Sequence, residues 1–477
     1  KNRLILNSIT IQKDNILISY VILNNDIDKS VIIEYLRSHL PEYGIPSYII
    51  KLKEFPLNLN NKIDRSKLPL PKIDFKNNLT DIEKFIYNVI DIPLKLNNNI
   101  NSYGLSSINI SLLCYNLNKK YNIKLCVPDF YKYETLGEIF DIRVSKYKID
   151  EVISNRNYLN TYKELFSKNF NILMDRNESK IKKNYMKNIL LLGGCGYVGT
   201  YFTKRLMILE NVKIYVMVHN SLPKKTYSNV EYIKGNITRH KLGIKENYEY
   251  LNENIDIVIN CIAMVDWLKP FKDLCSVNSY SIINILKFCE YKNKRLIHLS
   301  STGIFNNTNI VRSNNLEDYP PYNGYGESKW FCEKLLEEAL KNLSIPINII
   351  RVGYILGDKD YDSNSDDFII QYINFCNEYN IIPNIHKNNK VNIIKINILT
   401  NIIKDICLNN ISQTYINLYR GIRIEDLVES YKYINYDLFI EELNNNIKKY
   451  NILSVLSHLM KRKISSPYFD SKILYLV

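Results

Sequence analysis

The stretch ILLLGGCGYVGTYFTKRLM, residues 189–207, decides the fold of most of this chain. An apolar run that fits a buried strand leads directly into the glycine turn Gly193–Gly199, and an apolar-periodic segment that fits a helix follows the turn. Glycines at such a turn let backbone N–H groups approach a pyrophosphate, and the N-terminus of the following helix favours its charge. The stretch therefore predicts a Rossmann-type, doubly wound α/β domain that binds a dinucleotide.

Two later stretches complete the pattern. HLSSTGIF, residues 298–305, places hydroxyl side chains at the end of a second apolar run, and NGYGESKW, residues 323–330, places Tyr325 and Lys329 four residues apart. On a helix that spacing puts both side chains on one face. There Tyr325 can donate its phenolic proton, and Lys329 can favour the tyrosinate and bond a nicotinamide ribose. The three stretches, in this order, predict hydride transfer.

The composition indicates which classes of protein this chain can belong to. The length of 477 residues predicts about three domains, and 46% hydrophobic with 23% charged residues is typical of a globular chain. No apolar run approaches 18 residues and no secretory segment is recognised, so we expect neither export nor a membrane partner. Nine scattered cysteines favour reduced thiols and a cytoplasmic location, with no metal site. Because the first residue is Lys1, we expect the chain to be part of a longer protein.

The net charge of +14 does not by itself indicate a nucleic-acid partner. Lysine is spread along the whole chain together with Asn, Ile and Tyr, and no RNA- or DNA-binding motif accompanies it. We therefore expect lysine-rich solvated surfaces and no nucleic-acid binding.

Residues 1–72 predict a small α/β unit, with strands at 16–23 and 47–55 and a helix at 31–40. The turn that follows contains Asn61-Lys62-Ile63-Asp64-Arg65, which resembles the N-G-K-[IV]-D-R motif of the carboxyl-terminal subdomain of adenylate-forming enzymes. The resemblance implies that Lys62 reaches the acyl phosphate and adenylate. The alternative is a solvated turn lysine. The large nucleotide-binding subdomain is absent, so we expect ATP chemistry only with an upstream adenylation core as partner.

Residues 73–145 predict four short helices. Within them YGLSSI, residues 103–108, resembles the phosphopantetheine attachment site of carrier domains, and VPDFYKYETLGEIF, residues 127–140, also fits the carrier pattern. The resemblance implies that Ser107 carries 4′-phosphopantetheine after the action of a phosphopantetheinyl transferase, with Ser106 in place of the usual Asp or His. The alternative for Ser107 is a helix N-cap. Residues 146–185 are rich in Lys, Asn and Tyr and predict a linker, and residues 186–477 predict the reductase domain.

The order of these parts resembles the terminal thioester reductases of nonribosomal peptide synthetases and the α-aminoadipate reductases. Four further stretches carry the likeness: residues 232–244 with Asn236 for the family's Asp, residues 259–271, residues 351–357 with Val352 for Pro, and residues 363–368. The resemblance implies Ser301, with Thr302 as the alternative, as the hydroxyl beside Tyr325. The cofactor contacts that we expect are Gly193, Gly194, Gly196, Tyr197, Val198, Gly199, His219, Lys224, Lys225, Asn236, Ile262, Ala263, Asn278 and Lys329.

The choice of dinucleotide depends on the residues after the strand that ends at Val218. The family usually has an Arg there, whereas this chain has His219, which can equally be a surface histidine. No acidic residue is present to bond a free ribose 2′-hydroxyl, and Lys224 and Lys225 follow closely. The pattern favours NADPH over NADH.

These features predict a carrier-tethered carboxylic acid reductase that releases an acyl or amino-acyl thioester as an aldehyde, with α-aminoadipate as one candidate acid. One alternative is an extended short-chain dehydrogenase or epimerase that acts on a free small molecule, but the carrier motif argues against it. A second alternative is a degenerate scaffold without turnover, suggested by Ser106, Asn236 and Val352. The intact Ser107, Ser301, Tyr325 and Lys329 argue against that alternative.

Overall fold

The structure is a computed structural model of the chain, and it divides into two compact units. One unit holds residues 1–151 and 447–458, and the other holds residues 152–446 and 459–477. Each unit is described by itself. The residues that the structure describes are 5–13, 16–24, 29–37, 46, 48–56, 63–69, 80–92, 94–103, 105, 107–121, 125, 127, 129–144, 161–170, 187–219, 226–305, 309–319, 321, 323–358, 362–365, 367–409, 411–446, 449–450, 453 and 468–469.

The first unit begins with a three-stranded sheet of order β1-β2-β3. Strand β2 pairs antiparallel with β1 and parallel with β3, and helix α1 lies between β2 and β3 in the chain. Their bounds are β1 Ile5–Lys13, β2 Ile16–Leu23, α1 Lys29–Arg37 and β3 Tyr48–Lys51. The strand at 16–23 is as predicted, whereas β3 ends four residues before the predicted end at Phe55. Asn61 and Lys62 lie outside the described residues.

Four helices follow in the stretch that predicts a carrier: α2 Asp81–Ile90, α3 Ser107–Tyr121, α4 Asp129–Lys132 and α5 Leu136–Val144. A capping box starts α2, in which the Glu83 N–H donates to Thr80 Oγ1 at 3.4 Å and the Thr80 N–H donates to the Glu83 carboxylate at 2.8 Å. Apolar residues of these helices and loops are fully buried, among them Ile86, Leu113 and Leu136. Ser107 is the first residue of α3, and Ser106 lies outside the described residues. The carrier identity stays a prediction.

The second unit is built on a seven-stranded parallel sheet of order β14-β10-β8-β7-β4-β5-β6. The strands are β4 Lys187–Leu192, β5 Val212–Val218, β6 Val230–Lys234, β7 Ile257–Asn260, β8 Arg295–Ser301, β10 Ile347–Val352 and β14 Tyr415–Asn417. The strand order runs outward from β4 in one direction and from β7 in the other, so the topological switch point lies between these two strands. Ligands of such sheets bind at this point. The predicted doubly wound Rossmann fold is confirmed.

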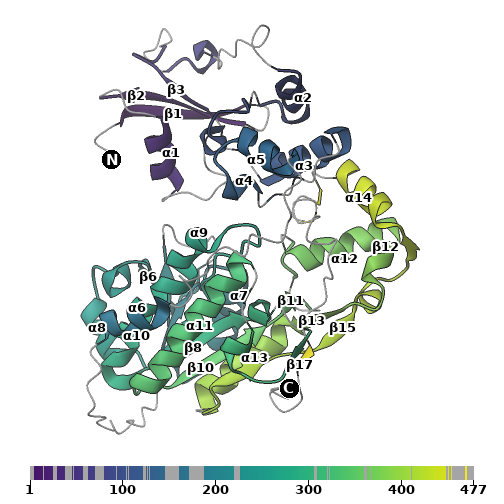
Figure 1. Ribbon diagram of the computed structural model, residues 1–477. Coiled ribbons are helices and arrows are strands. Elements are labelled where there is room, and N and C mark those ends of the chain that lie inside the picture. Colours follow the sequence, from purple (N-terminus) through teal and green to yellow (C-terminus); the bar gives the residue numbers. More distant parts are fainter. Residues whose placement is uncertain are drawn as a thin grey trace. The chain divides into compact units, whose positions relative to one another are not determined.

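Alternating side chains of each strand enter two different hydrophobic cores. Leu190 and Leu192 of β4 pack in the core that holds α10 and α11, whereas Ile189 and Leu191 pack in the core that holds α7 and α13. Helices therefore cover both faces of the sheet (Figure 1). Their bounds are α7 Tyr197–Leu206, α8 Tyr248–Asn254, α9 Phe271–Cys275, α10 Ser281–Glu290, α11 Gly324–Asn342 and α13 Ile396–Asn409.

Part of the predicted linker contributes to the core of this second unit. Helix α6, Tyr162–Asn169, buries Tyr162 and Phe166, and the Tyr162 ring lies edge-on to Trp330 of α11 with centroids 6.1 Å apart. The linker prediction is therefore incomplete, because it includes a helix that packs on the reductase. Its apolar residues recur every four positions among Lys and Asn, a signal that the biased composition conceals.

Three small sheets complete the second unit, and all their strands except β9 follow β10 in the chain. They are β11-β13-β15, β12-β16 and β17-β9, and helices α12 and α14 accompany them. The bounds are β9 Ile310–Val311, β11 Tyr354–Leu356, α12 Phe368–Tyr379, β12 Ile381–Pro383, β13 Lys390–Lys395, β15 Gly421–Arg423, β16 Lys432–Ile434, α14 Tyr436–Asn445 and β17 Tyr468–Phe469.

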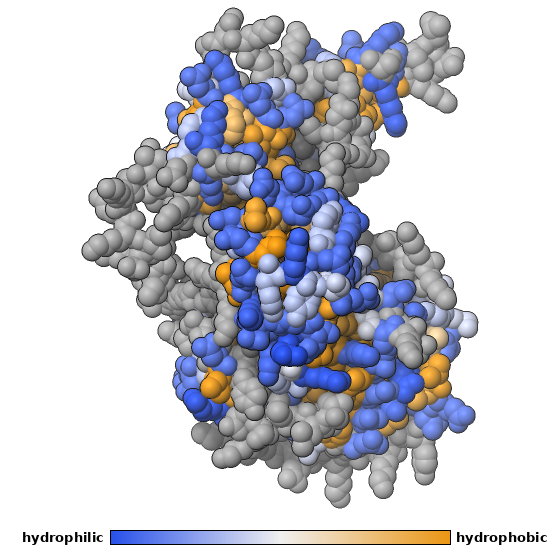
Figure 2. All heavy atoms as spheres, turned by 90° about the vertical axis from the view of Figure 1, so that its right-hand side faces the viewer, coloured by the Kyte–Doolittle hydropathy of each residue, from blue (hydrophilic) through white to orange (hydrophobic). Residues whose placement is uncertain are grey.

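On the face shown in Figure 2, hydrophilic residues dominate and apolar residues gather in small patches. Among the described helices, none is long and apolar enough to cross a bilayer.

A buried ion pair joins three elements of the sheet layer. The Arg351 guanidinium of β10 donates two bonds to one carboxylate oxygen of Glu333 on α11, at 2.6 and 3.0 Å, and both side chains are fully buried. The Ser300 hydroxyl of β8 donates to the same carboxylate, and Arg351 also donates to Asn314 at 2.7 Å. Because Glu333 lies one turn after Lys329, this network fixes how α11 sits on the sheet.

Glu333→Gln tests this network. The substitution keeps the shape of the side chain but leaves the Arg351 guanidinium buried without its counter-charge. We expect the free energy of unfolding of the second unit to fall by about 3–5 kcal/mol, measured by urea denaturation. The control is Arg423→Gln, which removes an exposed ion pair with Asp426 and should leave the transition unchanged. Equal denaturation midpoints for Glu333→Gln and the wild type would contradict this role.

Candidate active site

The glycine turn after β4 is a close-packed cradle at the switch point. Gly193 has a φ of +89°, which side-chain-bearing residues rarely adopt, and the Gly196 N–H donates to the Gly193 carbonyl at 3.0 Å. A Cβ atom on Gly199 would lie 2.1 Å from that carbonyl oxygen, so α7 can approach the turn only with glycine there. The first turn of α7 thus presents its N-terminus beside the turn, as a dinucleotide pyrophosphate requires.

The end of β7 forms the other wall of this cradle. A Cβ atom on Gly193 would lie 3.0 Å from the backbone nitrogen of Ile262, so the two loops touch. The Ile262 N–H donates to Asn260 Oδ1 at 3.2 Å, which holds the start of the loop. Ala263 follows and is partly exposed. The structure therefore brings the predicted glycine contacts together with Ile262 and Ala263.

Tyr325, Ser301 and Lys329 converge at the end of β8. The Ser301 side chain lies beside the Tyr325 hydroxyl and acts to lower the pKa of that phenol, and Ser301 Oγ accepts the Gly303 N–H at 3.0 Å. One turn along α11, Lys329 Nζ donates to the Leu299 carbonyl of β8 at 3.1 Å. Thr302, the alternative hydroxyl, is buried in the short turn Thr302–Phe305, and the hydroxyl that acts on Tyr325 is that of Ser301.

Burial sets the proton affinities of this group. Tyr325 is 6% exposed, and burial raises the pKa of its phenol to about 12, while the Ser301 side chain acts in the opposite direction. Burial lowers the pKa of Lys329, which is 2% exposed. Tyr325 therefore holds its proton at neutral pH and can deliver it to an oxygen that gains negative charge.

Two side chains hold the loop beside Tyr325. The Trp267 ring, from the recognised stretch 259–271, lies against the Tyr325 ring with centroids 5.5 Å apart. Asn278, predicted as a cofactor contact, uses its amide on the protein: it accepts the Met264 N–H at 2.7 Å and donates to the Met264 carbonyl and to Ser328 Oγ. Asn278 therefore positions the loop relative to α11. No local motif signals such a bond across 50 residues.

A chain of buried polar groups lies behind Lys329. Asn260 Nδ2 donates to His298 Nδ1 at 3.1 Å, so the ring proton lies on His298 Nε2, which points to Cys332 Sγ at 3.6 Å. Burial, with the nearby Lys329 charge, lowers the pKa of His298 well below its usual value. The neutral ring therefore joins β7, β8 and α11 beneath the catalytic face.

The predicted adenosine end of the site is only partly described. His219 follows β5, and Asn236 Nδ2 contacts His219 Nε2 at 3.1 Å. The Asn236 carbonyl oxygen accepts the N–H and the hydroxyl of Thr238 at 2.9 and 2.7 Å. Lys224 and Lys225 lie outside the described residues. The structure thus brings His219 and Asn236 together and says nothing of the two lysines.

Helix α7 also contacts the region beyond β11. The Tyr197 hydroxyl donates to the Asp362 carbonyl at 2.8 Å, and burial raises the pKa of the Tyr197 phenol to about 12. Val198 packs on the core at the same end of α7. Asp362 is also one of the residues that line a cavity of about 460 Å³. The full lining is Leu356, Gly357, Asp362, Ser363, Ser365, Ile370, Ile373, Asn374 and Leu427. The stretch 363–368 recognised in the sequence therefore borders a cavity next to the glycine-turn helix.

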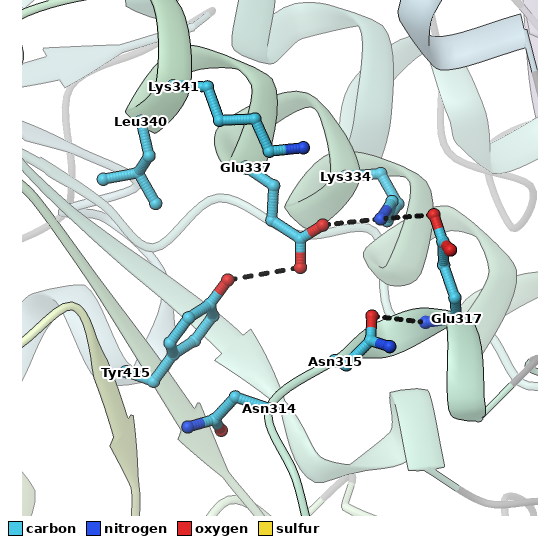
Figure 3. A pocket seen from close by; sticks show the side chains of 8 residues that line it. All are labelled: Asn314, Asn315, Glu317, Lys334, Glu337, Leu340, Lys341 and Tyr415. Carbon is cyan, nitrogen blue, oxygen red and sulfur yellow. Dashed lines mark hydrogen bonds and ion pairs between the residues drawn. The ribbon is translucent and has the colours of Figure 1, made fainter.

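A second cavity, of about 520 Å³, is shown in Figure 3 and contains none of the predicted catalytic residues. Its charged side chains pair with one another: Lys334 bonds Glu337 at 2.6 Å and Glu317 at 3.3 Å, and the Tyr415 hydroxyl donates to Glu337 at 3.2 Å. These pairs leave no excess charge to select a ligand. We assign this cavity a structural role at the edge of the sheet.

Comparisons with known proteins point to the same class of enzyme. Residues 191–403 match the family described as male sterility protein. L-2-aminoadipate reductase of Schizosaccharomyces pombe is 27% identical over 76% of this chain, and the large subunit of that enzyme from Candida glabrata is 25% identical over 85%. The chain spans 30% and 35% of the length of these two relatives.

Solved structures show the same fold. A thiolation-reductase di-domain from an archaeal nonribosomal peptide synthetase superposes with a TM-score of 0.57 at 19% identity, over 84% of this chain and 92% of its own. The terminal reductase domain of the myxalamid pathway gives 0.55 at 18% identity, over 65% of this chain and 90% of its own. The sequence relatives agree with the resemblance drawn from the motifs: this chain is similar to L-2-aminoadipate reductases, and it has the fold of the reductase domains of nonribosomal peptide synthetases.

Proposed function

We propose that this chain reduces an acyl thioester, carried on the phosphopantetheine arm of Ser107, to an aldehyde with NADPH. The observation that carries the proposal is the buried Tyr325 side chain, beside Ser301 and one turn from Lys329, in the same unit as a glycine cradle that fits a dinucleotide. The likeness to aminoadipate reductases and the carrier pattern at residues 103–108 support a tethered rather than a free substrate.

The proposed reaction needs a hydride donor for the carbonyl carbon and a proton donor for the carbonyl oxygen. NADPH, when bound along the glycine cradle, supplies a hydride for the thioester carbonyl carbon. The Tyr325 phenol gives its proton to the carbonyl oxygen, and Ser301 holds that phenol in place, so the product of this step is a neutral hemithioacetal. The C–S bond then breaks, the sulfur takes the hydroxyl proton, and the aldehyde leaves a free thiol on the arm.

Lys329 has two proposed tasks. Its ammonium group lies one helical turn from Tyr325 and stabilises the phenolate that remains after proton transfer. The same group is placed to bond the nicotinamide ribose. Its lowered pKa, caused by burial, reflects a charge that a bound ribose would help to solvate.

The cofactor and the acid are proposed from different observations. NADPH is favoured because Lys224 and Lys225 follow β5 and no acidic residue stands directly after Val218. The relatives favour an amino-dicarboxylic acid such as α-aminoadipate. Activation of the acid by an upstream adenylation core, to which Lys62 would contribute, and loading by a phosphopantetheinyl transferase complete the proposed scheme.

The proton donor is tested by Tyr325→Phe. The variant keeps the ring against Trp267 and removes the proton, so folding and NADPH binding should survive. We expect single-turnover NADPH oxidation with an acyl-phosphopantetheine thioester to fall roughly a hundredfold or more. Lys329→Ala should lower both the rate and the cofactor affinity.

The two hydroxyl residues provide the matched comparison. Ser301→Ala should lower the rate with little effect on NADPH binding, and Thr302→Ala should do less, because the Ser301 side chain is the one that acts on the Tyr325 hydroxyl. A near-wild-type rate for Tyr325→Phe would mean that the proton comes from another group.

The carrier assignment is tested by modification. Incubation of the chain with coenzyme A and a phosphopantetheinyl transferase should add one phosphopantetheine arm, read by intact-mass spectrometry. Ser107→Ala should abolish the mass shift, and Ser106→Ala should keep it. An arm that still appears on Ser107→Ala would remove Ser107 from the scheme.

Cofactor preference is tested by titrating NADPH and NADH, followed by the fluorescence of the reduced nicotinamide. We expect tighter binding of NADPH, and the double variant Lys224→Ala, Lys225→Ala should narrow the difference by roughly tenfold or more, because two charge-assisted contacts with the 2′-phosphate are lost. Equal affinities of the unmodified protein for both cofactors would contradict the proposed preference.

A further inference from the structure

The side chain of Asn323 has a hydrogen-bond donor that none of the described residues accepts. Asn323 is the N-cap of α11, two residues before Tyr325, and its Oδ1 accepts the Gly326 N–H at 2.7 Å. Within the described residues, the Asn323 Nδ2 atom is buried and has no hydrogen-bond partner. A buried donor without an acceptor lowers stability, so its presence beside a reaction centre needs a reason.

The N-cap bond fixes which way the amide faces. A backbone N–H can only donate, so the atom that faces Gly326 must be the amide oxygen. The amide nitrogen then points elsewhere, as a neutral donor. A ligand that satisfies it must offer an oxygen or nitrogen lone pair.

Asn323 lies between the two segments that also enclose Tyr325. A Cβ atom on Gly326 would lie 3.0 Å from the Gly303 carbonyl and 3.1 Å from Asn323 Oδ1, so the amide is next to the turn that begins after Ser301. On the other side, a Cβ atom on Gly324 would lie 2.2 Å from the carbonyl oxygen of Lys269, two residues after Trp267.

The loop that contains Trp267 and Lys269 contacts both the segment of Asn323 and the Tyr325 ring. The Trp267 ring packs on the Tyr325 ring, and Tyr325 itself is 6% exposed. The loop that flanks Asn323 therefore also lies against Tyr325, so a substrate at the Tyr325 hydroxyl is in the part of the site to which Asn323 belongs.

We propose that Asn323 Nδ2 donates a hydrogen bond to a carbonyl oxygen of the thioester substrate and is a further catalytic residue of this site. The proposal rests on the proposed function, because a thioester on a pantetheine arm offers acceptors of this kind: the thioester carbonyl and the amide carbonyls of the arm. A donor already oriented by its N-cap bond needs no reorganisation when charge develops on the oxygen.

Asn323→Ser and Asn323→Asp test the proposal. Both residues are good N-caps, so both keep the Gly326 bond while removing the amide donor, and thermal unfolding should stay near that of the wild type. The Ser hydroxyl keeps an O–H, but the shorter side chain places it away from the position of Nδ2. We expect kcat/KM for an acyl-pantetheine thioester to fall about tenfold or more in Asn323→Ser, and further in Asn323→Asp, whose carboxylate repels the substrate oxygen. NADPH affinity should not change.

The matched control is Asn435→Asp, which makes the same change at the N-cap of α14, where Asn435 accepts the Asp437 N–H at 2.8 Å. It should leave the kinetics unchanged. A simple S-ethyl thioester of the same acid distinguishes the two acceptors: an equal loss with both substrates assigns the thioester carbonyl, and a loss confined to the pantetheine thioester assigns an arm amide.

Three results would overturn the proposal. Wild-type kinetics of both Asn323 variants with both substrates would show that the donor serves a bound water, and a loss of NADPH affinity would show that it serves the cofactor. If the wild type reduces no thioester, the proposed function fails instead. Substrate binding is then measured by the quenching of tryptophan fluorescence, with a non-reducible thioether analogue that keeps the arm amides and with the matching S-acyl thioester. Equal affinities of the wild type and Asn323→Ser for both compounds would again exclude the role.

Discussion

The buried ion pair between Arg351 and Glu333 is the interaction on which the site depends. It joins β10 to α11, and Ser300 extends it to β8, the strand that ends in Ser301. Two buried charges are tolerable only when they satisfy each other, so this geometry allows little movement. Glu333 stands one turn beyond Lys329, and Lys329 stands one turn beyond Tyr325. The ion pair therefore sets the height and rotation of the helix that carries both Tyr325 and Lys329.

The same helix is held at its other end by contacts that exclude larger residues. Gly324 and Gly326 allow α11 to approach the loop at Lys269 and the turn at Gly303, and Asn278 ties Met264 to Ser328. The reacting groups are thus surrounded by side chains and backbone atoms, which explains why the phenol of Tyr325 keeps its proton and why Lys329 is easier to deprotonate. The burial that excludes water from Tyr325 and Lys329 is thus also what shifts their pKa values.

The parts that could be predicted from the sequence are those in which a local pattern has one structural meaning. The run before Gly193 and the glycine turn define a strand, a turn and a helix, and the spacing of Tyr325 and Lys329 defines a helix face. The parts that could not be predicted depend on partners far apart in the chain. Arg351 and Trp267 lie in stretches that carry the family likeness, and Asn278 is expected to contact the cofactor, but no local pattern indicates which groups of the protein they bind. Likewise, Tyr162 and Phe166 lie in a Lys- and Asn-rich stretch, and only their contacts with α11 reveal a helix that belongs to the reductase core.

The central claim is that the second unit transfers a hydride to a thioester carbonyl and releases an aldehyde. The most direct measurement uses NADPH stereospecifically deuterated at C4, with either the pro-R or the pro-S position labelled, and an acyl-phosphopantetheine thioester, followed by mass spectrometry of the released product. The account predicts that one of the two labelled cofactors gives an aldehyde with one deuterium on its carbonyl carbon, together with one free pantetheine thiol. Release of an unlabelled carboxylic acid with both cofactors, or oxidation of NADPH without label in the product, would contradict it.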